Sequence, residues 1–354
     1  MSTKMSFSTL QVGRAIAAIA VVIFHANTFF VPQRLHGGDS AARIFDMGYA
    51  GVEYFFVLSG FIMVLSHRHQ FGDASCAGNF LTKRVVRIIP FYWAVMLVLL
   101  AMMLVYPSAA DGRFSVENLL HSLFLVPNSD GTPLMIHSAW TLSHEFLFYF
   151  VFTALFFSLR WGAALFGFWM LGVALTQGLG AIAYPFDFLF SIYNLLFLLG
   201  IVAAFAHAHV KPPLGWTLAL GGAAIFLANG IVHTYALAEV SHVLRTVIYG
   251  VAACMMVTGF AGLELAGRIR SNRGLVFLGD ASYSIYLVHG IALSIFTKIV
   301  TAAKLNQHLT PFLSLTLLVV LATLAGCLAH LWIERPLLAA LRPSRRVGTP
   351  VTRG

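Results

Sequence analysis

The sequence predicts an all-α, polytopic integral membrane protein with about ten transmembrane helices and with both termini in the cytoplasm. Three observations predict this class. Of the 354 residues, 59% are hydrophobic and only 10% are charged, which is more apolar than a water-soluble domain needs to fill one core. Apolar stretches of about 20 residues, long enough to cross roughly 30 Å of hydrocarbon, recur along the chain. Lys and Arg gather in alternate connections between these stretches.

The apolar stretches set the expected helices in order. They lie at 10–31, 48–66, 88–106, 138–159, 161–178, 187–206, 213–231, 242–261, 276–300 and 312–333. The first is expected to stay as a helix, because its apolar run is longer than that of a cleaved signal peptide. The connections are too short to bury cores of their own, so 1–336 is predicted to be one membrane domain. In one connection, Ser115 is expected to cap a short interfacial helix. The basic tail, 337–354, is expected to be cytoplasmic and disordered.

The distribution of basic residues gives the expected orientation. With the N-terminus in the cytoplasm, sixteen of the 22 Lys and Arg residues fall on the cytoplasmic side, as the positive-inside rule requires. The net charge of +9 then reflects topology and anion attraction, and no nucleic-acid partner is predicted. Cys76, Cys254 and Cys327 form no CxxC motif, and the His-x-His pairs point to different helix faces. Neither disulfides nor a metal site is therefore predicted.

Charged residues inside the predicted spans are the first candidates for a site, because they are costly in lipid unless they face a cavity or a partner. Arg14 and His25 lie eleven residues apart, which returns to nearly the same helix face after about 16 Å of rise. Arg14 alone is also explained by the positive-inside rule, and His25 alone by interfacial hydrogen bonding. Because both residues share one helix face, a functional role is favoured over these two separate structural explanations.

Arg84 and Arg87 lie three residues apart in the block FLTKRVVRIIP, so they share a helix face at the cytoplasmic boundary. Two guanidinium groups there suit a phosphate. The alternative is a plain topogenic cluster, which is the commoner meaning of basic residues before a span.

Two carboxylates fall in or beside predicted spans. Glu53 shares a face with Gly60, and Ser59 with Gly60 forms a small-residue notch that another helix or a ligand can approach. Glu145 lies in the fourth span, five residues after Trp140, and is followed by Phe146 to Phe150. At that depth it should be paired, protonated or facing water. His25 is its expected partner, because a carboxylate that orients an imidazole supports general-base catalysis on a hydroxyl.

The ninth span carries a polar stripe. Gly279 and Asp280 are expected to begin the helix, and Tyr283, Tyr286 and His289 follow at steps of three. Such a stripe suits the wall of a cavity for a sugar, although tyrosines and a histidine that satisfy one another between helices would give the same pattern.

These motifs together resemble the membrane acyltransferase-3 family, and within it the acyltransferases of exopolysaccharide production and O-antigen O-acetylation. The resemblance runs from about Leu10 to Pro336. It rests, in order, on Arg14 with His25, the block GVEYFFVLSGF at 51–61, the block KRVVRIIP at 83–90, Trp140-Thr141-Leu142 with Glu145 and Tyr149, LGDASYSIYL at 278–287 with His289, and Glu334-Arg335-Pro336. The sequence departs from the family at Gly13 and at Ser143-His144, which bears on the acceptor more than on the reaction.

The resemblance implies a membrane O-acyltransferase of the bacterial inner membrane. Acetyl-CoA or another cytoplasmic acyl-CoA would be the co-substrate, with no permanently bound cofactor, and a cell-surface or lipid-linked polysaccharide would be the acceptor. It implies donor binding by Arg14, Arg84 and Arg87. With the residues above, we expect catalysis by His25, oriented by Glu145 or by another buried carboxylate, with a covalent acyl-histidine relay as the alternative to direct transfer. Glu53, Ser59, Trp140, Tyr283, Tyr286 and His289 are the expected acceptor or cavity-lining residues. A glycan or solute transporter and a non-catalytic membrane protein of polysaccharide assembly are the alternatives, although no internal repeat supports a transporter.

Overall fold

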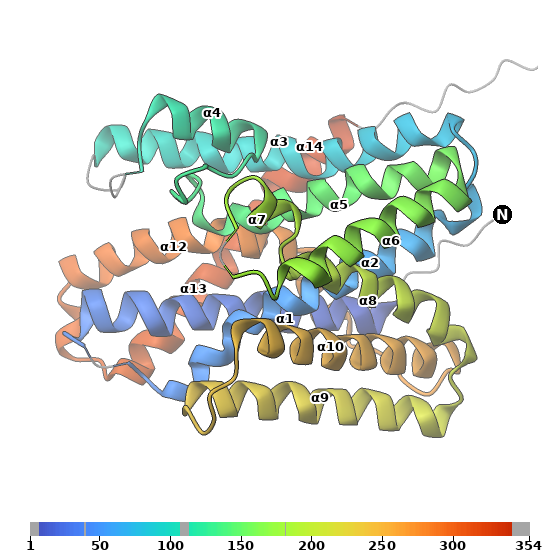
Figure 1. The fold of residues 1–354 in the computed structure, drawn as a ribbon. Coiled ribbons are helices and arrows are strands. Elements are labelled where there is room, and N and C mark those ends of the chain that lie inside the picture. Colours follow the sequence, from blue (N-terminus) through green and yellow to red (C-terminus); the bar gives the residue numbers. More distant parts are fainter. Residues whose placement is uncertain (1–6, 39, 107–112, 181, 342–354) are drawn as a thin grey trace, which may run out of the picture.

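The computed structural model describes residues 7–38, 40–106, 113–180 and 182–341, and every regular element in these ranges is helical. Figure 1 shows a bundle whose long helices run roughly side by side. The elements are α1 (Ser8–His25), η1 (Ala26–Leu35), η2 (Arg43–Ala50), α2 (Gly51–His67), η3 (Arg68–Gln70), α3 (Ser75–Val105), α4 (Val116–Phe124), η5 (His137–Ala139), α5 (Trp140–Phe157), α6 (Leu159–Thr176), α7 (Phe186–Leu189), α8 (Tyr193–Ala206), η6 (His207–His209), α9 (Pro212–Thr234), α10 (His242–Leu265), α11 (Arg273–Asp280), α12 (Ser282–Ala302), η7 (Leu305–Gln307), α13 (Pro311–Ala329), η8 (His330–Glu334) and α14 (Arg335–Ala340).

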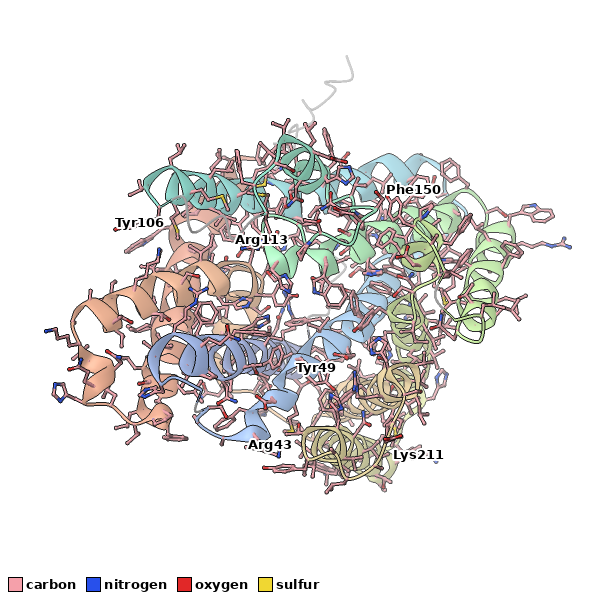
Figure 2. The ribbon with its side chains drawn as sticks, turned by 60° about the vertical axis from the view of Figure 1, so that its left-hand side comes forward. Arg43, Tyr49, Tyr106, Arg113, Phe150 and Lys211 are labelled. Carbon is pink, nitrogen blue, oxygen red and sulfur yellow. The ribbon has the colours of Figure 1, made fainter. Side chains whose placement is uncertain are left out.

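Ten helical segments in the described ranges are long and apolar enough to cross a membrane. This confirms both the all-helical class and the predicted number of spans. Large apolar side chains cover the outside of the bundle, among them Leu104, Phe150 and Trp332, which are 87%, 74% and 72% exposed. Figure 2 shows Phe150 pointing away from the helices. An apolar surface of this extent is expected where the surrounding solvent is lipid.

The third helix begins earlier than the hydropathy pattern predicts. α3 starts at Ser75 and contains 31 residues, which corresponds to a length of about 46 Å. Arg84 and Arg87 therefore lie inside a continuous helix and not in a connection before it. The helix also continues through Pro90. The apolar window missed this extension because the basic residues lower its hydropathy.

The ninth span is broken where the sequence predicts its start. Asp280 ends α11, and α12 begins at Ser282, so Gly279 and Asp280 close one helix and do not open the next. The physical reason is close packing. A Cβ atom on Gly279 would overlap the backbone carbonyl of Gln11 in α1, so only glycine lets α11 approach α1 this closely. The break places the first turn of α12 beside Arg14.

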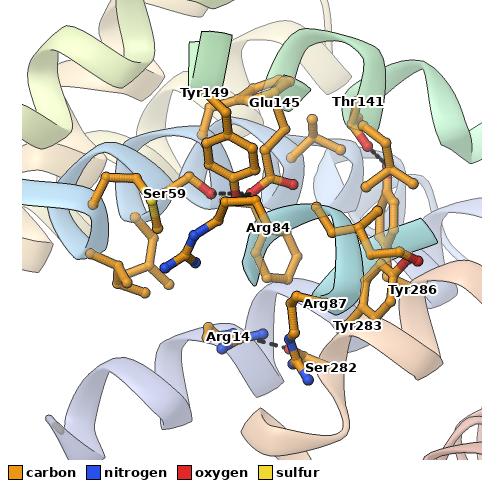
Figure 3. A pocket seen from close by; sticks show the side chains of 18 residues that line it. Arg14, Ser59, Arg84, Arg87, Thr141, Glu145, Tyr149, Ser282, Tyr283 and Tyr286 are labelled. Atoms are coloured by element: carbon orange, nitrogen blue, oxygen red, sulfur yellow. Dashed lines mark hydrogen bonds between the residues drawn. The ribbon is translucent and has the colours of Figure 1, made fainter. Parts of the chain in front are cut away.

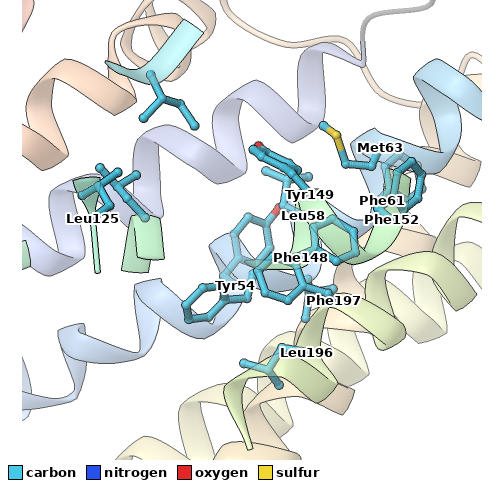
Figure 4. Packing of buried hydrophobic residues seen from close by; sticks show 14 of the residues in the cluster. Tyr54, Leu58, Phe61, Met63, Leu125, Phe148, Tyr149, Phe152, Leu196 and Phe197 are labelled. Atoms are coloured by element: carbon cyan, nitrogen blue, oxygen red, sulfur yellow. The ribbon is translucent and has the colours of Figure 1, made fainter. Parts of the chain in front are cut away.

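The small-residue notch of α2 is filled by another helix. Cβ atoms on Gly60 and Gly200 would overlap the backbone of the opposite helix, at Phe197 and Val57 respectively, so α2 and α8 cross in backbone contact. Nearby, the rings of Phe148 and Phe197 stack with centroids 4.2 Å apart. Figure 4 shows this aromatic packing between α5 and α8. The crossing anchors α2 and orients its other faces.

The helical winding changes at two points that matter for the site. α1 ends at His25, and the chain continues as a π-helix, η1. A second π-helical segment, η8, contains His330 and Glu334. π-Helical turns are rare and often occur at functional sites. Both π-helical segments therefore indicate where a functional site is expected.

Two further predictions concern the connections and the C-terminus. The interfacial helix is present as α4, and the Ser115 hydroxyl accepts a hydrogen bond from the Asn118 amide at 3.0 Å. At the other end of the chain, α14 runs to Ala340, so residues 337–340 of the predicted tail are helical. Residues 342–354 of the tail lie outside the described part of the chain.

Candidate active site

A cavity of about 170 Å³ lies between α1, α2, α3, α5 and α12, and we call it the basic cavity. Figure 3 shows its side chains converging from these helices. Its polar lining residues are Arg14, Ser59, Arg84, Arg87, Thr141, Glu145, Tyr149, Ser282, Tyr283 and Tyr286. All three arginines predicted to bind the donor therefore meet in one place. α1 supplies one of them and α3 supplies the other two.

The three arginines of the basic cavity differ in their partners. Arg14 donates from Nε to the Ser282 hydroxyl at 3.1 Å. Arg84 places Nη2 3.0 Å from the Nε2 atom of His67. In the described part of the chain, neither arginine has a carboxylate within ion-pair distance. Both guanidinium groups face the cavity without an ion-pair partner, which suits an anionic ligand.

Arg87 differs because it forms an ion pair. Its Nη1 atom lies 2.7 Å from Oε1 of Glu334, which is fully buried. The other carboxylate oxygen accepts hydrogen bonds from the Ser284 hydroxyl at 2.6 Å and from His330 Nδ1 at 2.7 Å. Glu334, which does not itself line the cavity, thus holds the guanidinium of Arg87 in place.

Glu145 also lines the basic cavity, and it does not pair with His25. Its Oε1 atom accepts a hydrogen bond from the Ser59 hydroxyl at 2.9 Å and another from the Tyr149 hydroxyl. The expected pairing with His25 is therefore wrong. Helical phase in α5 placed the carboxylate toward the interior correctly, but it could not show which helix faces it there.

A second cavity of about 180 Å³ contains His25, and we call it the histidine cavity. Its polar and aromatic lining residues are Phe24, His25, Tyr49, Glu53, His137, Ser138, Trp140, Tyr193 and Tyr286. His137 is solvent-exposed, so the cavity opens to the exterior of the bundle at that residue. Arg14 and His25 both face the interior, as predicted, but they lie about 16 Å apart along α1 and line different cavities.

The imidazole of His25 is held in one tautomer. Nδ1 lies 2.9 Å from the carbonyl oxygen of Val21, one turn earlier in α1. Because a carbonyl oxygen only accepts hydrogen bonds, Nδ1 carries the proton and Nε2 is left as a base. The ring of His289 packs against the ring of His25, with centroids 4.8 Å apart. His289 lines neither of the two cavities, so the prediction that it is a lining residue is wrong; its contact is with the ring of His25.

Glu53 is the carboxylate that shares the cavity with His25. Its side chain is 2% exposed, and Oε2 has no hydrogen-bond partner in the described part of the chain. A buried carboxylate oxygen without a partner is costly. Glu53 is therefore available to a ligand group in this cavity.

The remaining predicted residues divide between the two cavities. Ser59 and Tyr283 line only the basic cavity, whereas Trp140 lines only the histidine cavity. Tyr283 donates from its hydroxyl to the carbonyl of Ile88 at 2.9 Å. Tyr286 lines both cavities. The candidate site is thus two adjoining chambers, one cationic and one carrying an imidazole and a carboxylate.

Comparison with known proteins decides the family. Residues 7–332 match the sequence profile of the acyltransferase-3 family, which is described as an acyltransferase domain. This chain belongs to the acyltransferase-3 family. The match covers all ten membrane-crossing segments except the end of the last. The resemblance that the sequence motifs predict is thereby confirmed, and the protein is an acyltransferase.

Two relatives of this acyltransferase are informative. The exopolysaccharide production protein ExoZ of Rhizobium meliloti (strain 1021) is 31% identical, over 88% of this chain and 96% of the relative. The acyltransferase MdmB of Streptomyces mycarofaciens is 26% identical, over 95% of this chain and 92% of the relative. No solved structure matches the chain.

Several residues of the candidate site received no role from the sequence, although Glu334 and Tyr149 belong to its motifs. Glu334 is an acidic residue at the end of a span, and treating the last span as one turn longer would have revealed it as an intramembrane carboxylate. Tyr149 was noted only as part of a motif, and its contact with Glu145 follows from their spacing of four. Tyr49 and Tyr193 carry no signal that distinguishes them from the aromatic belt of a membrane protein.

Proposed function

We propose that this acyltransferase moves an acyl group, with acetyl as the first candidate, from acyl-CoA to a hydroxyl of a cell-surface or lipid-linked polysaccharide. A single observation carries the proposal. A cavity with three arginines adjoins a cavity with a histidine base, which are the two environments that an anionic thioester donor and a hydroxyl acceptor require. The name of the relative ExoZ supports a polysaccharide as the acceptor.

The donor binds in the basic cavity. The phosphates of CoA interact with Arg14 and Arg84, whose charges lack a carboxylate partner, and with Arg87, which Glu334 holds in place. Charge-assisted hydrogen bonds to phosphate are among the stronger polar interactions. The pantetheine arm then directs the thioester away from the arginines and toward His25.

His25 acts as the general base. Its Nε2 atom takes the proton of the sugar hydroxyl while the hydroxyl oxygen attacks the thioester carbonyl. The tetrahedral intermediate collapses, the carbon–sulfur bond breaks, and the leaving thiolate takes the proton back from the imidazolium. The products are an O-acyl ester and free CoA, so no redox partner is needed.

Glu53 replaces Glu145 as the carboxylate that assists His25. It lines the same cavity and has a free carboxylate oxygen, so it stabilises the imidazolium that forms during the reaction or holds a hydroxyl of the sugar. Glu145 then serves the donor side, where it lies among the arginines. Trp140, Tyr49 and Tyr193 give the histidine cavity aromatic faces on which a sugar ring can pack.

The orientation follows from the location of CoA. Basic residues are most frequent on the side of the bundle that carries Arg14 and Arg84, so we place this side and both termini in the cytoplasm of a bacterial cell. The histidine cavity, which opens at His137, then faces the opposite side, where a surface polysaccharide is assembled. The protein thus resides in the inner membrane and takes its two substrates from opposite sides.

The decisive experiment measures CoA release from acetyl-CoA by the purified protein in nanodiscs, with polysaccharide from a strain that lacks the gene as acceptor. We expect release that depends on the polysaccharide, and mass spectrometry should find a gain of one acyl group on the glycan. His25→Gln should abolish both signals. Release that proceeds equally well without a glycan, or unchanged transfer by the His25 variant, would contradict the proposal.

A further inference from the structure

The two cavities meet at a boundary formed by Val52 and Tyr286. These are the residues that line both the basic cavity and the histidine cavity. The residues of α2 that follow Val52 divide between the two cavities. Glu53 lines the histidine cavity, whereas Phe55 lines the basic cavity. A group that passes directly from the basic cavity to the histidine cavity therefore passes these two side chains.

Tyr286 is fixed at this boundary by hydrogen bonds. Its hydroxyl accepts from the Thr141 hydroxyl and donates to the carbonyl of Ser138, both at 3.2 Å. The ring is 7% exposed and packs edge-on against Phe55, with centroids 6.0 Å apart. Because α5 holds the phenol and α2 supports the ring, Tyr286 cannot swing aside without losing buried hydrogen bonds. Val52 is the side chain left to set the width of the passage.

We propose that Val52 and Tyr286 form a selective junction that admits a short acyl group from the basic cavity to His25 and excludes longer acyl chains. This proposal rests on the proposed function. The cavity beyond the junction measures about 180 Å³, close to the size of an engineered cavity of about 150 Å³ that binds benzene. The same space must also admit the sugar hydroxyl, so only a short acyl group fits beside it.

Substitutions of Val52 test the junction directly. Val52→Phe narrows it, and we expect transfer of acetyl to fall at least tenfold while the affinity for acetyl-CoA stays within about twofold, because the arginines are untouched. Val52→Ala widens it, and we expect the butanoyl-to-acetyl rate ratio to rise by about tenfold, the effect of about one methylene in an apolar specificity pocket. Val202→Phe, on the half-exposed outer face of α8, is the matched control and should behave as the wild type.

The readouts separate this proposal from the proposed function. Donor affinity is measured by displacement of a fluorescent CoA analogue, and transfer is measured with acetyl-, butanoyl- and hexanoyl-CoA on the isolated polysaccharide. If the wild type transfers none of these groups, the proposed function fails. Suppose that the wild type transfers acetyl but Val52→Phe does so equally well, or that Val52→Ala leaves the butanoyl-to-acetyl rate ratio unchanged. The proposal of a selective junction is then wrong, while the proposed function stands. Loss of donor affinity in Val52→Phe would also overturn it, by placing Val52 in the donor site. Should Val52→Phe not fold, Val52→Ala alone decides.

Discussion

The Ser59 hydroxyl donates a 2.9 Å hydrogen bond to Glu145 and so links α2 to α5 across the wall of the basic cavity. Two hydroxyl groups, one from Ser59 and the other from Tyr149, hold the Oε1 atom of Glu145, and no arginine in the described part of the chain lies within ion-pair distance of this carboxylate. The contact with Ser59 also keeps Glu145 in the cavity that we propose for the donor. Five expected outcomes follow from this division of the site.

Replacing Glu145 by Gln removes a negative charge from the cavity that we propose receives the CoA phosphates. We expect KM for acetyl-CoA to fall severalfold, because repulsion between the carboxylate and the phosphates is lost, with a small change in kcat. Steady-state kinetics on the purified protein checks this. A kcat loss as large as that of a His25 variant would instead return Glu145 to a catalytic role.

The base and its carboxylate should affect turnover and not donor binding. We expect His25→Gln to lower kcat by about 10² to 10⁴-fold, the usual contribution of a general base, and Glu53→Gln to have a smaller effect of the same kind. Affinity for acetyl-CoA should stay unchanged in both. His209→Gln, at an exposed position in η6, serves as the control. A weakened donor affinity in the His25 variant would contradict the separation of the two cavities.

The unpaired arginines should govern donor affinity. Arg14→Gln and Arg84→Gln are each expected to raise KM for acetyl-CoA by about tenfold or more, since a hydrogen bond to a charged group contributes about 1.5 to 3 kcal/mol. Lys83→Gln changes a neighbouring exposed charge on α3 and should have little effect. Comparing acetyl-CoA with its 3′-dephospho form identifies which arginine contacts the ribose phosphate. If Arg14→Gln and Arg84→Gln had the same KM for acetyl-CoA as the Lys83→Gln control, these arginines would not bind the CoA phosphates.

The ion pair between Arg87 and Glu334 should matter more for stability than the contact of Arg84 with His67. Arg87→Met leaves a buried carboxylate with only Ser284 and His330 as partners, which we expect to cost about 2 to 3 kcal/mol. This lies below the range for a fully buried pair, because the Arg87 side chain is partly exposed. Thermal unfolding in detergent measures the loss. Adding Glu334→Gln to the Arg87 variant should recover part of it.

The crossing of α2 and α8 should tolerate no added methyl group. Gly200→Ala puts a Cβ atom into the carbonyl of Val57, and overpacking of this kind costs about 1 to 3 kcal/mol. Gly167→Ala in α6 meets nothing within 4 Å and should be neutral or stabilising. The melting temperatures of the two variants give the comparison. Similar values would show that the helices can separate at no cost.

The sequence predicted the outline of the fold because its physical basis is local. Segment length and hydropathy fix the number of spans, and helical phase places Arg14 and His25 toward the interior. The longer α3 was missed because basic residues inside a helix look like a connection to a hydropathy window. The break before Ser282 was missed because its cause, the contact of Gly279 with α1, joins residues far apart in the chain.

The sequence predicted which residues contribute to the candidate site, but it did not predict which of them contact one another. Periodicity identifies which side chains of a helix face inward, and it found Glu53, Glu145 and Tyr286. It says nothing about which of two inward-facing carboxylates lies near His25, because that depends on the rotation and depth of neighbouring helices. The same limit concealed the role of Val52, an apolar residue whose importance is its position between two cavities.

The bond between Arg87 and Glu334 has a consequence for the biogenesis of the protein. α3 enters the membrane early in synthesis, whereas η8 is among the last helical segments to leave the ribosome. During that interval Arg87 has no carboxylate partner and must stay near water or lipid headgroups, as arginine does at a membrane interface. Arrival of Glu334 then joins α3 to the last membrane-crossing segment, so a chain truncated before η8 would leave Arg87 of the basic cavity without the carboxylate that holds it.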